Sequence, residues 1–297
     1  MGATDFTLGV DIGGTHVRIG VVAPDGRVVS RVDSRLPPDG EPALLHALLA
    51  DGVRQATGEC GTPTGRVGVA LPGVWNRASG VLERALNLPR LEGVELRRFF
   101  AEAVGGPVFL ESDVNAAGWA QWHHLDPRPA RFVYLSLGTG VGGSVILDGE
   151  LVRHTRGVTG HFGFLVVDTS TDAPVDAAGV PGCLSAVAAG PALQGSAPPG
   201  EPLKYEMEPV LSEAVRERAA RGLAVALANV VYIYAPDCIV LGGGVIDHHP
   251  ELVEDARAVL DRYRGDLVPA ELAIEQAALR SDDAGVIGAA LLARRSA

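Results

Sequence analysis

Three glycine-rich segments of this sequence could bind phosphate, because each follows an apolar run that is typical of a strand. Glycine lets the backbone take positive φ and approach a ligand closely, and successive amides in such a turn form a concave anion site. The segments are Asp11-Ile12-Gly13-Gly14-Thr15, Gly138-Thr139-Gly140-Val141-Gly142-Gly143 and Gly242-Gly243-Gly244. Each alone is about as well explained by a tight turn, but three at three strand ends together predict a nucleotide site.

The acid in the first segment indicates how a metal ion would take part. Asp11 would repel a phosphate directly. It suits a site in which a Mg²⁺ ion with its water shell lies between the carboxylate and the phosphate. The alternative is an aspartate that only caps a hairpin turn.

Two common phosphate-binding motifs are excluded by the sequence. The spacing Gly138-x-Gly140-x-x-Gly143 matches the dinucleotide fingerprint, but that site needs a helix after the glycines, and residues 144–147 are strand-like. The single lysine, Lys204, lies in none of the glycine-rich segments, so the chain carries no P-loop.

A carboxylate stands where a predicted strand ends and a predicted helix begins, in Glu111-Ser112-Asp113-Val114-Asn115. Asp113 at this position could accept a proton from a bound hydroxyl, and the amides of the helix N-terminus would favour a nearby negative group. The alternative is that Ser112 or Asp113 merely caps the helix, since both residue types are favoured there.

Strands and helices alternate around these segments, which predicts an α/β protein. Residues 6–30 predict a strand, a glycine turn, a strand, an Asp-Gly turn and a third strand, and residues 131–152 repeat the plan. This duplicated unit suggests two related lobes. Further strands are predicted at 66–71, 108–111 and 238–241, and helices at 43–55, 95–104, 114–122, 207–234, 250–263 and 284–293; residues 153–182 are expected to be irregular and 195–202 to form a loop.

The composition favours a globular protein of the cytoplasm. Of the 297 residues, 47% are hydrophobic, enough for one large domain or two lobes. The net charge of −11 argues against a nucleic-acid partner. Cys60, Cys183 and Cys238 are too scattered for a disulfide framework and fit a reducing compartment. Residues 1–7 do not resemble a signal peptide, and the most apolar stretch, 223–235, is too short to span a bilayer.

Taken together, the segments resemble the ROK family of bacterial sugar kinases, repressors and uncharacterised open reading frames, nearly from end to end. The three glycine-rich segments are similar to its two phosphate motifs and its adenosine-side glycine motif. Leu71-Pro72-Gly73 with Leu86-Asn87-Leu88-Pro89 is similar to its sugar segment. Ser112-Asp113-Val114-Asn115-Ala116-Ala117 is similar to its catalytic segment, and residues 282–290 resemble its closing helix.

The resemblance implies the two-lobed actin-like ATPase fold of sugar kinases, Hsp70 and actin, in which each lobe is a mixed sheet flanked by helices. We expect an N-terminal lobe at 1–112, completed by the closing helix at 283–297, and a C-terminal lobe at 113–282. The resemblance also implies ATP with Mg²⁺ as cofactors, a sugar substrate in the cleft, and usually a homodimer. From the net charge and the short apolar stretch we expect no nucleic-acid or membrane partner.

The resemblance further implies a role for each matching residue. Asp113 would be the general base that takes a proton from a sugar hydroxyl, usually the 6-hydroxyl. The nucleotide phosphates would lie against the glycine-rich segments, with Asp11 holding Mg²⁺ indirectly. The residues expected to bind the sugar are Gly73, Asn87, Ser112, Asp113 and His161.

The sequence departs from the family in its zinc loop. The positions of the usual four zinc ligands are here Phe164, Asp176, Ala178 and Cys183. Phenylalanine and alanine cannot ligate, and nothing in the spacing of His154 or His161 suggests a replacement, so we expect no structural zinc.

In the family, the same region contacts the far end of the sugar through three polar side chains. The matching positions are here occupied by His161, Phe164 and Ser185. We therefore expect glucose to be a poor substrate. His161 is equally well explained as a packing residue, or as a donor to a sugar oxygen.

Three functions compete at this stage. A sugar kinase is the leading hypothesis, and a regulator that binds sugar or nucleotide with weak or no turnover is the second. The retained Asp113 favours catalysis over the regulator. The third, an actin-like or chaperone-like ATPase, is disfavoured by the sugar segment around Gly73 and Asn87.

Overall fold

A computed structural model describes residues 5–58, 65–153, 160–195, 210–263, 265 and 271–296. The chain divides into two units. Within the described part, unit 1 comprises residues 5–124, Arg153 and 282–296, and unit 2 comprises residues 125–152 and 160–281. Residues 113–124, which the expected division assigned to the C-terminal lobe, form a helix that packs on two strands of unit 1.

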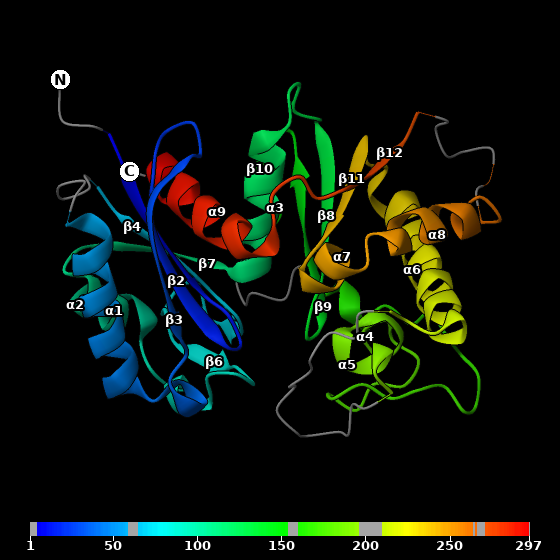
Figure 1. The fold of residues 1–297 in the computed structure, drawn as a ribbon, viewed down its shortest axis with the longest axis horizontal. Helices are drawn as coiled ribbons and strands as arrows, with labels where there is room; N and C mark the ends of the chain where they lie inside the picture. Colours follow the sequence, from blue (N-terminus) through cyan, green and yellow to red (C-terminus); the bar gives the residue numbers. More distant parts are fainter. Residues whose placement is uncertain are drawn as a thin grey trace. The chain divides into compact units, whose positions relative to one another are not determined.

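Unit 1 is built on a five-stranded mixed sheet in the order β3-β2-β1-β4-β7 (Figure 1). The first three strands are antiparallel, and β4 and β7 continue the sheet parallel to β1. Its strands are β1 (Thr7–Ile12), β2 (His16–Val22), β3 (Val28–Arg35), β4 (Val67–Leu71), β7 (Val108–Ser112) and the separate pair β5 (Val74–Trp75) and β6 (Leu82–Arg84). Its helices are α1 (Pro42–Thr57), α2 (Leu96–Val104), α3 (Asp113–His124), α9 (Ser281–Arg295) and the 3₁₀ turns η1 (Pro38–Gly40) and η2 (Pro89–Leu91).

Helices α1 and α2 cover one face of this sheet (Figure 1). That face carries large apolar side chains that pack under the two helices. Because side chains alternate along a strand, Leu8, Val10 and Ile12 of β1 all point to that face. They are buried together with Leu45 and Leu49 of α1. Burying a side chain of this size contributes about 1.5–3 kcal/mol.

The opposite face is lined by small residues, so that α9 approaches the strands closely. A Cβ added at Gly20 of β2 would lie 2.7 Å from Cγ1 of Val286, and one at Gly285 would lie 2.6 Å from either carboxylate oxygen of Asp11. Larger residues there would push the helix away from the sheet. The glycines therefore place the first turn of α9 against Asp11.

Unit 2 is built on a second five-stranded sheet in the order β10-β9-β8-β11-β12, with the same topology as the first. Here too an antiparallel meander is continued by two parallel strands. Its strands are β8 (Arg131–Leu137), β9 (Val141–Leu147), β10 (Glu150–Leu151), β11 (Cys238–Gly242) and β12 (Ala273–Gln276). Its helices are α4 (Leu184–Ala188), α5 (Gly190–Leu193), α6 (Glu213–Tyr234), α7 (Gly244–His248), α8 (Glu251–Leu260) and the 3₁₀ turn η3 (Phe162–Phe164).

The core of unit 2 lies between this sheet and its longest helix. Val133 and Leu135 of β8 are fully buried in one cluster with Leu223 and Leu227 of α6. The arginines of α6, among them Arg216, are exposed. Ser212 caps the helix by accepting a hydrogen bond from the amide of Val215 at 3.4 Å.

The sequence predicted the duplicated hairpins and most long elements to within a few residues. The predicted start of the long helix at Met207 lies outside the described residues, and α6 begins at Glu213. The elements that the sequence did not indicate are short: β5, β6, β12, α4, α5 and α7. Such elements span too few residues to develop a recognisable period.

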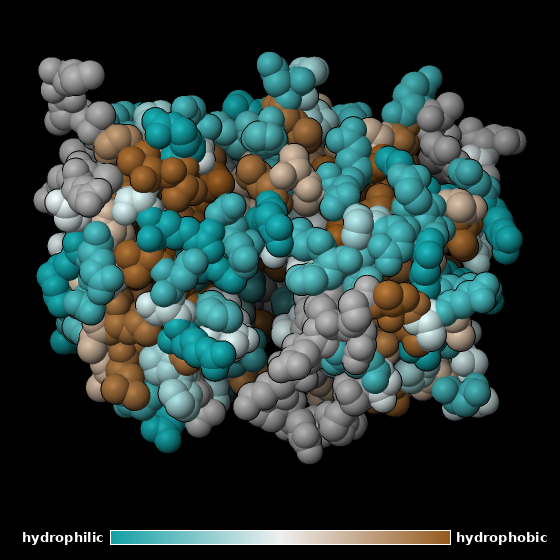
Figure 2. Space-filling view, in the orientation of Figure 1, coloured by the Kyte–Doolittle hydropathy of each residue, from teal (hydrophilic) through white to brown (hydrophobic). Residues whose placement is uncertain are grey.

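Much of the surface visible in Figure 2 is hydrophilic, in keeping with the net charge of −11. The exposed large apolar side chains include Tyr232, Ile233 and Tyr263 at the C-terminal ends of α6 and α8. None of the helices in the described part of the chain combines the length and apolar character needed to cross a membrane.

Candidate active site

Asp11 is the last residue but one of β1, and its carboxylate points to the α9 face of unit 1. It is only 6% exposed. The turn that follows is closed by a hydrogen bond of 2.8 Å from the amide of Gly13 to the carbonyl oxygen of His16. Gly14 and Thr15 at the tip of this turn are exposed.

Asp11 and Asp113 lie within electrostatic reach of each other, although they are distant in sequence. Burial, with the negative charge of Asp113 as the next contribution, raises the pKa of Asp11 to about 7. The nearby guanidinium of Arg18 acts in the opposite direction. Two acids in one partly buried place have the chemistry to bind a divalent cation or to take part in proton transfer.

Arg18 is a residue of this site that the sequence did not reveal. Its Nη1 atom lies 3.6 Å from Oδ2 of Asp11, and its Nη2 atom hydrogen-bonds to Asp282 in the first turn of α9. Arg18 faces the same side of the sheet as Asp11, because it is paired with Asp11 in the β1–β2 register. That register was the only signal that could have identified it.

Asp113 begins α3 directly after β7, as the sequence predicted. Ser112 caps the helix, because its Oγ atom accepts a hydrogen bond of 3.2 Å from the amide of Asn115. One carboxylate oxygen of Asp113 accepts a hydrogen bond of 2.8 Å from the amide of Val114. Ser112 is therefore the capping residue. Asp113 lies in the turn between Ser112 and Asn115, which this capping hydrogen bond joins.

The predicted sugar segment joins this region of unit 1. A Cβ at Gly14 would lie 2.9 Å from Nδ2 of Asn87, so that amide lies beside the first glycine turn. Gly73 has φ of +117° and passes close to Ala85, a conformation that other residues rarely adopt. The structure thus gathers Asp11, Asp113, Gly14 and Asn87 in one unit.

The second and third glycine turns meet in unit 2. They follow β8 and β11, which are parallel neighbours, so both turns lie at the same edge of the sheet. Gly243 has φ of +91°, and a Cβ there would lie 2.7 Å from the backbone nitrogen of Leu137, which immediately precedes Gly138. The amide of Gly138 donates to the carbonyl oxygen of Gly140 at 2.9 Å and closes its own turn.

The remaining predicted glycines and Thr139 belong to these two turns. Thr139 is half-buried between Gly138 and Gly140, and Gly142 lies in β9 opposite Ser136. Gly242 ends β11, and Gly244 begins the short helix α7.

His161 and Phe164 are both exposed, and their rings stack with centroids 6.0 Å apart at an interplanar angle of 24°. Ser185 is directed elsewhere, because its Oγ atom accepts a hydrogen bond of 3.1 Å from the amide of Val141 at the start of β9. Ser185 therefore stabilises the second glycine turn, and it has no carboxylate that could bind a sugar hydroxyl.

The zinc positions do not fit a zinc ion. Phe164 and Ala178 have no ligating atom, so only Asp176 and Cys183 of the four positions could bind a metal, and a structural zinc site needs four ligands. Asp176 instead accepts hydrogen bonds from the amides of Ala178 and Val180, at 3.0 and 2.8 Å. The described residues contain no group of three or more His, Cys, Asp or Glu side chains placed to hold a metal, and His154 lies outside them.

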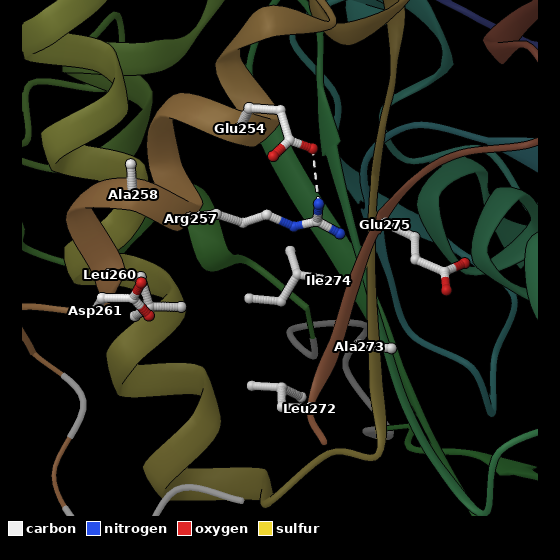
Figure 3. Close-up of a pocket in the computed structure, with 9 residues that line it drawn as sticks. All are labelled: Glu254, Arg257, Ala258, Leu260, Asp261, Leu272, Ala273, Ile274 and Glu275. Carbon is white, nitrogen blue, oxygen red and sulfur yellow. Dashed lines mark hydrogen bonds and ion pairs between the residues drawn. The ribbon is translucent and has the colours of Figure 1, made fainter. Parts of the chain in front are cut away.

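A hollow of about 430 Å³ lies on unit 2 between α8 and the edge strand β12 (Figure 3). Arg257 points into it and pairs with Glu254 at 2.7 Å. None of the residues that line the hollow is one of the predicted site residues.

Two mixed sheets of the same topology, each with glycine turns at its strand ends, define the class of actin-like ATPases. The chain belongs to the ROK family, whose pattern it matches over residues 7–296.

Its relatives include proteins named as sugar kinases. An N-acetylmannosamine kinase of Escherichia coli is 28% identical over 97% of this chain and 98% of its own. A ROK hexokinase of Thermus thermophilus is 31% identical, with a TM-score of 0.80 over 98% of both chains. A ROK glucokinase of Streptomyces griseus, solved with glucose and AMPPNP, is 26% identical, with a TM-score of 0.78 over 98% of this chain and 99% of its own.

Proposed function

We propose that the chain is an ATP-dependent sugar kinase that transfers a phosphoryl group to a sugar hydroxyl. The main support for the proposal is the pair Asp11 and Asp113. Asp11 is buried beside a glycine turn, and Asp113 begins helix α3. The kinase names of relatives at up to 31% identity support the same function.

The proposed general base is Asp113. Its carboxylate would accept the proton of the sugar hydroxyl while that oxygen attacks the terminal phosphorus and the bond from phosphorus to the leaving nucleotide oxygen breaks. Of the sugar's hydroxyls, the family resemblance favours the 6-hydroxyl. Asn87, which lies beside the first glycine turn, and Gly73 would hold the sugar so that this hydroxyl faces Asp113.

The residues near Asp11 fit a magnesium-bound nucleotide. Bound MgATP would supply the phosphoryl group and offset the charge that develops on it. The Gly13 amide is used inside its own turn, so the exposed Gly14 and Thr15 would face phosphate. The buried Asp11 carboxylate would orient water bound to the Mg²⁺ ion. The positive charge of that ion would favour the ionised form of Asp11.

The proposal is tested by ADP formation from ATP and Mg²⁺ with and without a panel of hexoses and N-acetylhexosamines. We expect ADP formation to rise with at least one sugar, and the Asp113→Ala variant to lose about 10²–10⁴-fold of that activity while remaining folded. Near-wild-type turnover by folded Asp113→Ala would show that another residue is the base. ATP or sugar binding without any sugar-dependent turnover would instead support a regulator. We also propose a homodimer, which analytical ultracentrifugation would check.

A further inference from the structure

Glu111, two residues before Asp113, is the buried centre of an ionic cluster in unit 1. Its side chain is 0% exposed. Its Oε1 atom forms an ion pair with Arg77, and its Oε2 atom accepts a hydrogen bond of 2.6 Å from Nε of Arg153. The two arginines come from separate segments, one after β5 and one after β10.

The cluster keeps the Glu111 carboxylate charged. Burial alone would raise its pKa, but Arg77 and Arg153, with hydrogen bonds from Asn115 and Arg153, together lower it below the ordinary value. An unpaired carboxylate in this position would be strongly destabilised, so Glu111 and its two partners depend on one another.

The same carboxylate holds the backbone and the side chain next to Asp113. Oε1 of Glu111 accepts hydrogen bonds from the amide of Ser112 at 2.9 Å and from Nδ2 of Asn115 at 3.0 Å. Ser112 and Asn115 are also joined by the capping hydrogen bond at the start of α3. Asp113 lies between these two anchored residues, so its orientation depends on where Glu111 is held.

Arg77 is itself fixed from two sides. Its guanidinium carbon lies 5.5 Å from the ring centroid of Trp75, which is buried, and its carbonyl oxygen accepts a hydrogen bond from Arg97 of α2. The position of Glu111 is therefore tied to the loop after β5.

We propose that Arg77 and Arg153 are positioning residues that act through Glu111 to hold Asp113 in its working orientation. The proposal rests on the proposed role of Asp113 as the base. A displacement of about 1 Å can reduce the rate about 10²-fold. Loss of one arginine should therefore lower kcat with the best sugar about ten- to a hundredfold, with little change in KM for ATP.

The first measurement compares Arg77→Met and Arg153→Met with the control Arg98→Met. Arg98 also pairs with a glutamate of unit 1, but both side chains are largely exposed, at 80% and 58%. A misplaced base should lower sugar phosphorylation more than sugar-independent ATP hydrolysis, so the ratio of the two rates should fall in the first two variants only. Arg77→Lys should restore part of the ratio of sugar phosphorylation to sugar-independent ATP hydrolysis. An equal fall in both rates, or a similar loss in Arg98→Met, would overturn the proposal, because a general loss of folded protein acts on both rates.

The second measurement is independent of activity. In the full chain, amide hydrogen exchange at Ser112–Asn115 should become faster in Arg77→Met, in Arg153→Met and in Glu111→Gln, and should stay unchanged in Arg98→Met. Unchanged exchange in the cluster variants would overturn the proposal. If the wild type phosphorylated no sugar at all, the proposed function would fail, and faster exchange would still support the anchoring of the turn.

Discussion

Replacing Asp11 with asparagine should make unit 1 more stable at alkaline pH while removing activity. The folded protein raises the pKa of Asp11 from 3.8 to about 7, because the carboxylate is buried and lies near Asp113. The folded state therefore binds this proton more tightly than the unfolded state. The contribution of Asp11 to the free energy of unfolding is therefore fully present below the unfolded pKa of 3.8. It falls as the pH rises from 3.8 to about 7, and it stays at its lower value above that range.

The size of the effect follows from the shift. A difference of about 3 pH units in pKa changes the free energy of unfolding by about 4 kcal/mol, because each unit corresponds to about 1.36 kcal/mol. We take this value as an upper bound. Asparagine has nearly the same shape and cannot ionise. Arg18 keeps its partner Asp282, so the substitution leaves no buried cation unpaired. We expect Asp11→Asn to stabilise unit 1 by about 1–4 kcal/mol near pH 8, and by about 2 kcal/mol less near pH 5.5.

Tryptophan fluorescence during denaturant unfolding is a direct assay. All three tryptophans, Trp75, Trp119 and Trp122, lie in unit 1, so their signal reports the unit that contains Asp11. The measurement is made without Mg²⁺ or nucleotide. Asp51→Asn is the matched control, because its carboxylate is largely exposed and contacts only neighbouring side chains of the same helix, Arg54 and Gln55. If Asp11→Asn were equally or less stable than the wild type near pH 8, the inference that burial destabilises the ionised form of Asp11 would be wrong.

Three further predictions concern the departures from the family and the packing of α9. The purified protein should contain no stoichiometric zinc by elemental analysis, because Phe164 and Ala178 cannot ligate; zinc whose removal by a chelator unfolds the protein would contradict this. Glucose should be a poor substrate by about a hundredfold or more in kcat/KM, because two lost sugar contacts at Phe164 and Ser185 cost roughly 1–3 kcal/mol each; a steady-state screen in which glucose ranks first with a submillimolar KM would refute it. Gly288→Ala should destabilise unit 1 by about 3 kcal/mol, because its Cβ would overlap the carbonyl oxygen of Ala116, whereas Gly106→Ala, with open space around it, should not; equal midpoints of unfolding would speak against the close packing of α9.

Local patterns were enough to predict the parts of the site that lie within one segment. The turns at Gly13 and Gly138 and the strand-to-helix junction at Asp113 are encoded by a few adjacent residues, and the structure has them where they were predicted. The same holds for the long elements, whose period-2 and period-3.6 patterns extend over several residues. Burial of single polar residues is not encoded in this local way. His249, just before the start of α8, is only 1% exposed.

The sequence by itself therefore determined the duplicated hairpins, the three glycine turns and the candidate base. Only the tertiary structure decided which charges meet. Arg18 reaches Asp11 through strand register, and Arg77 and Arg153 reach Glu111 from separate loops. Burial and these neighbouring charges together then set the pKa of each acid, raised for Asp11 and lowered for Glu111. Coulomb interactions and desolvation depend on distance and on exclusion of water, and both arise only when residues far apart in the chain pack together.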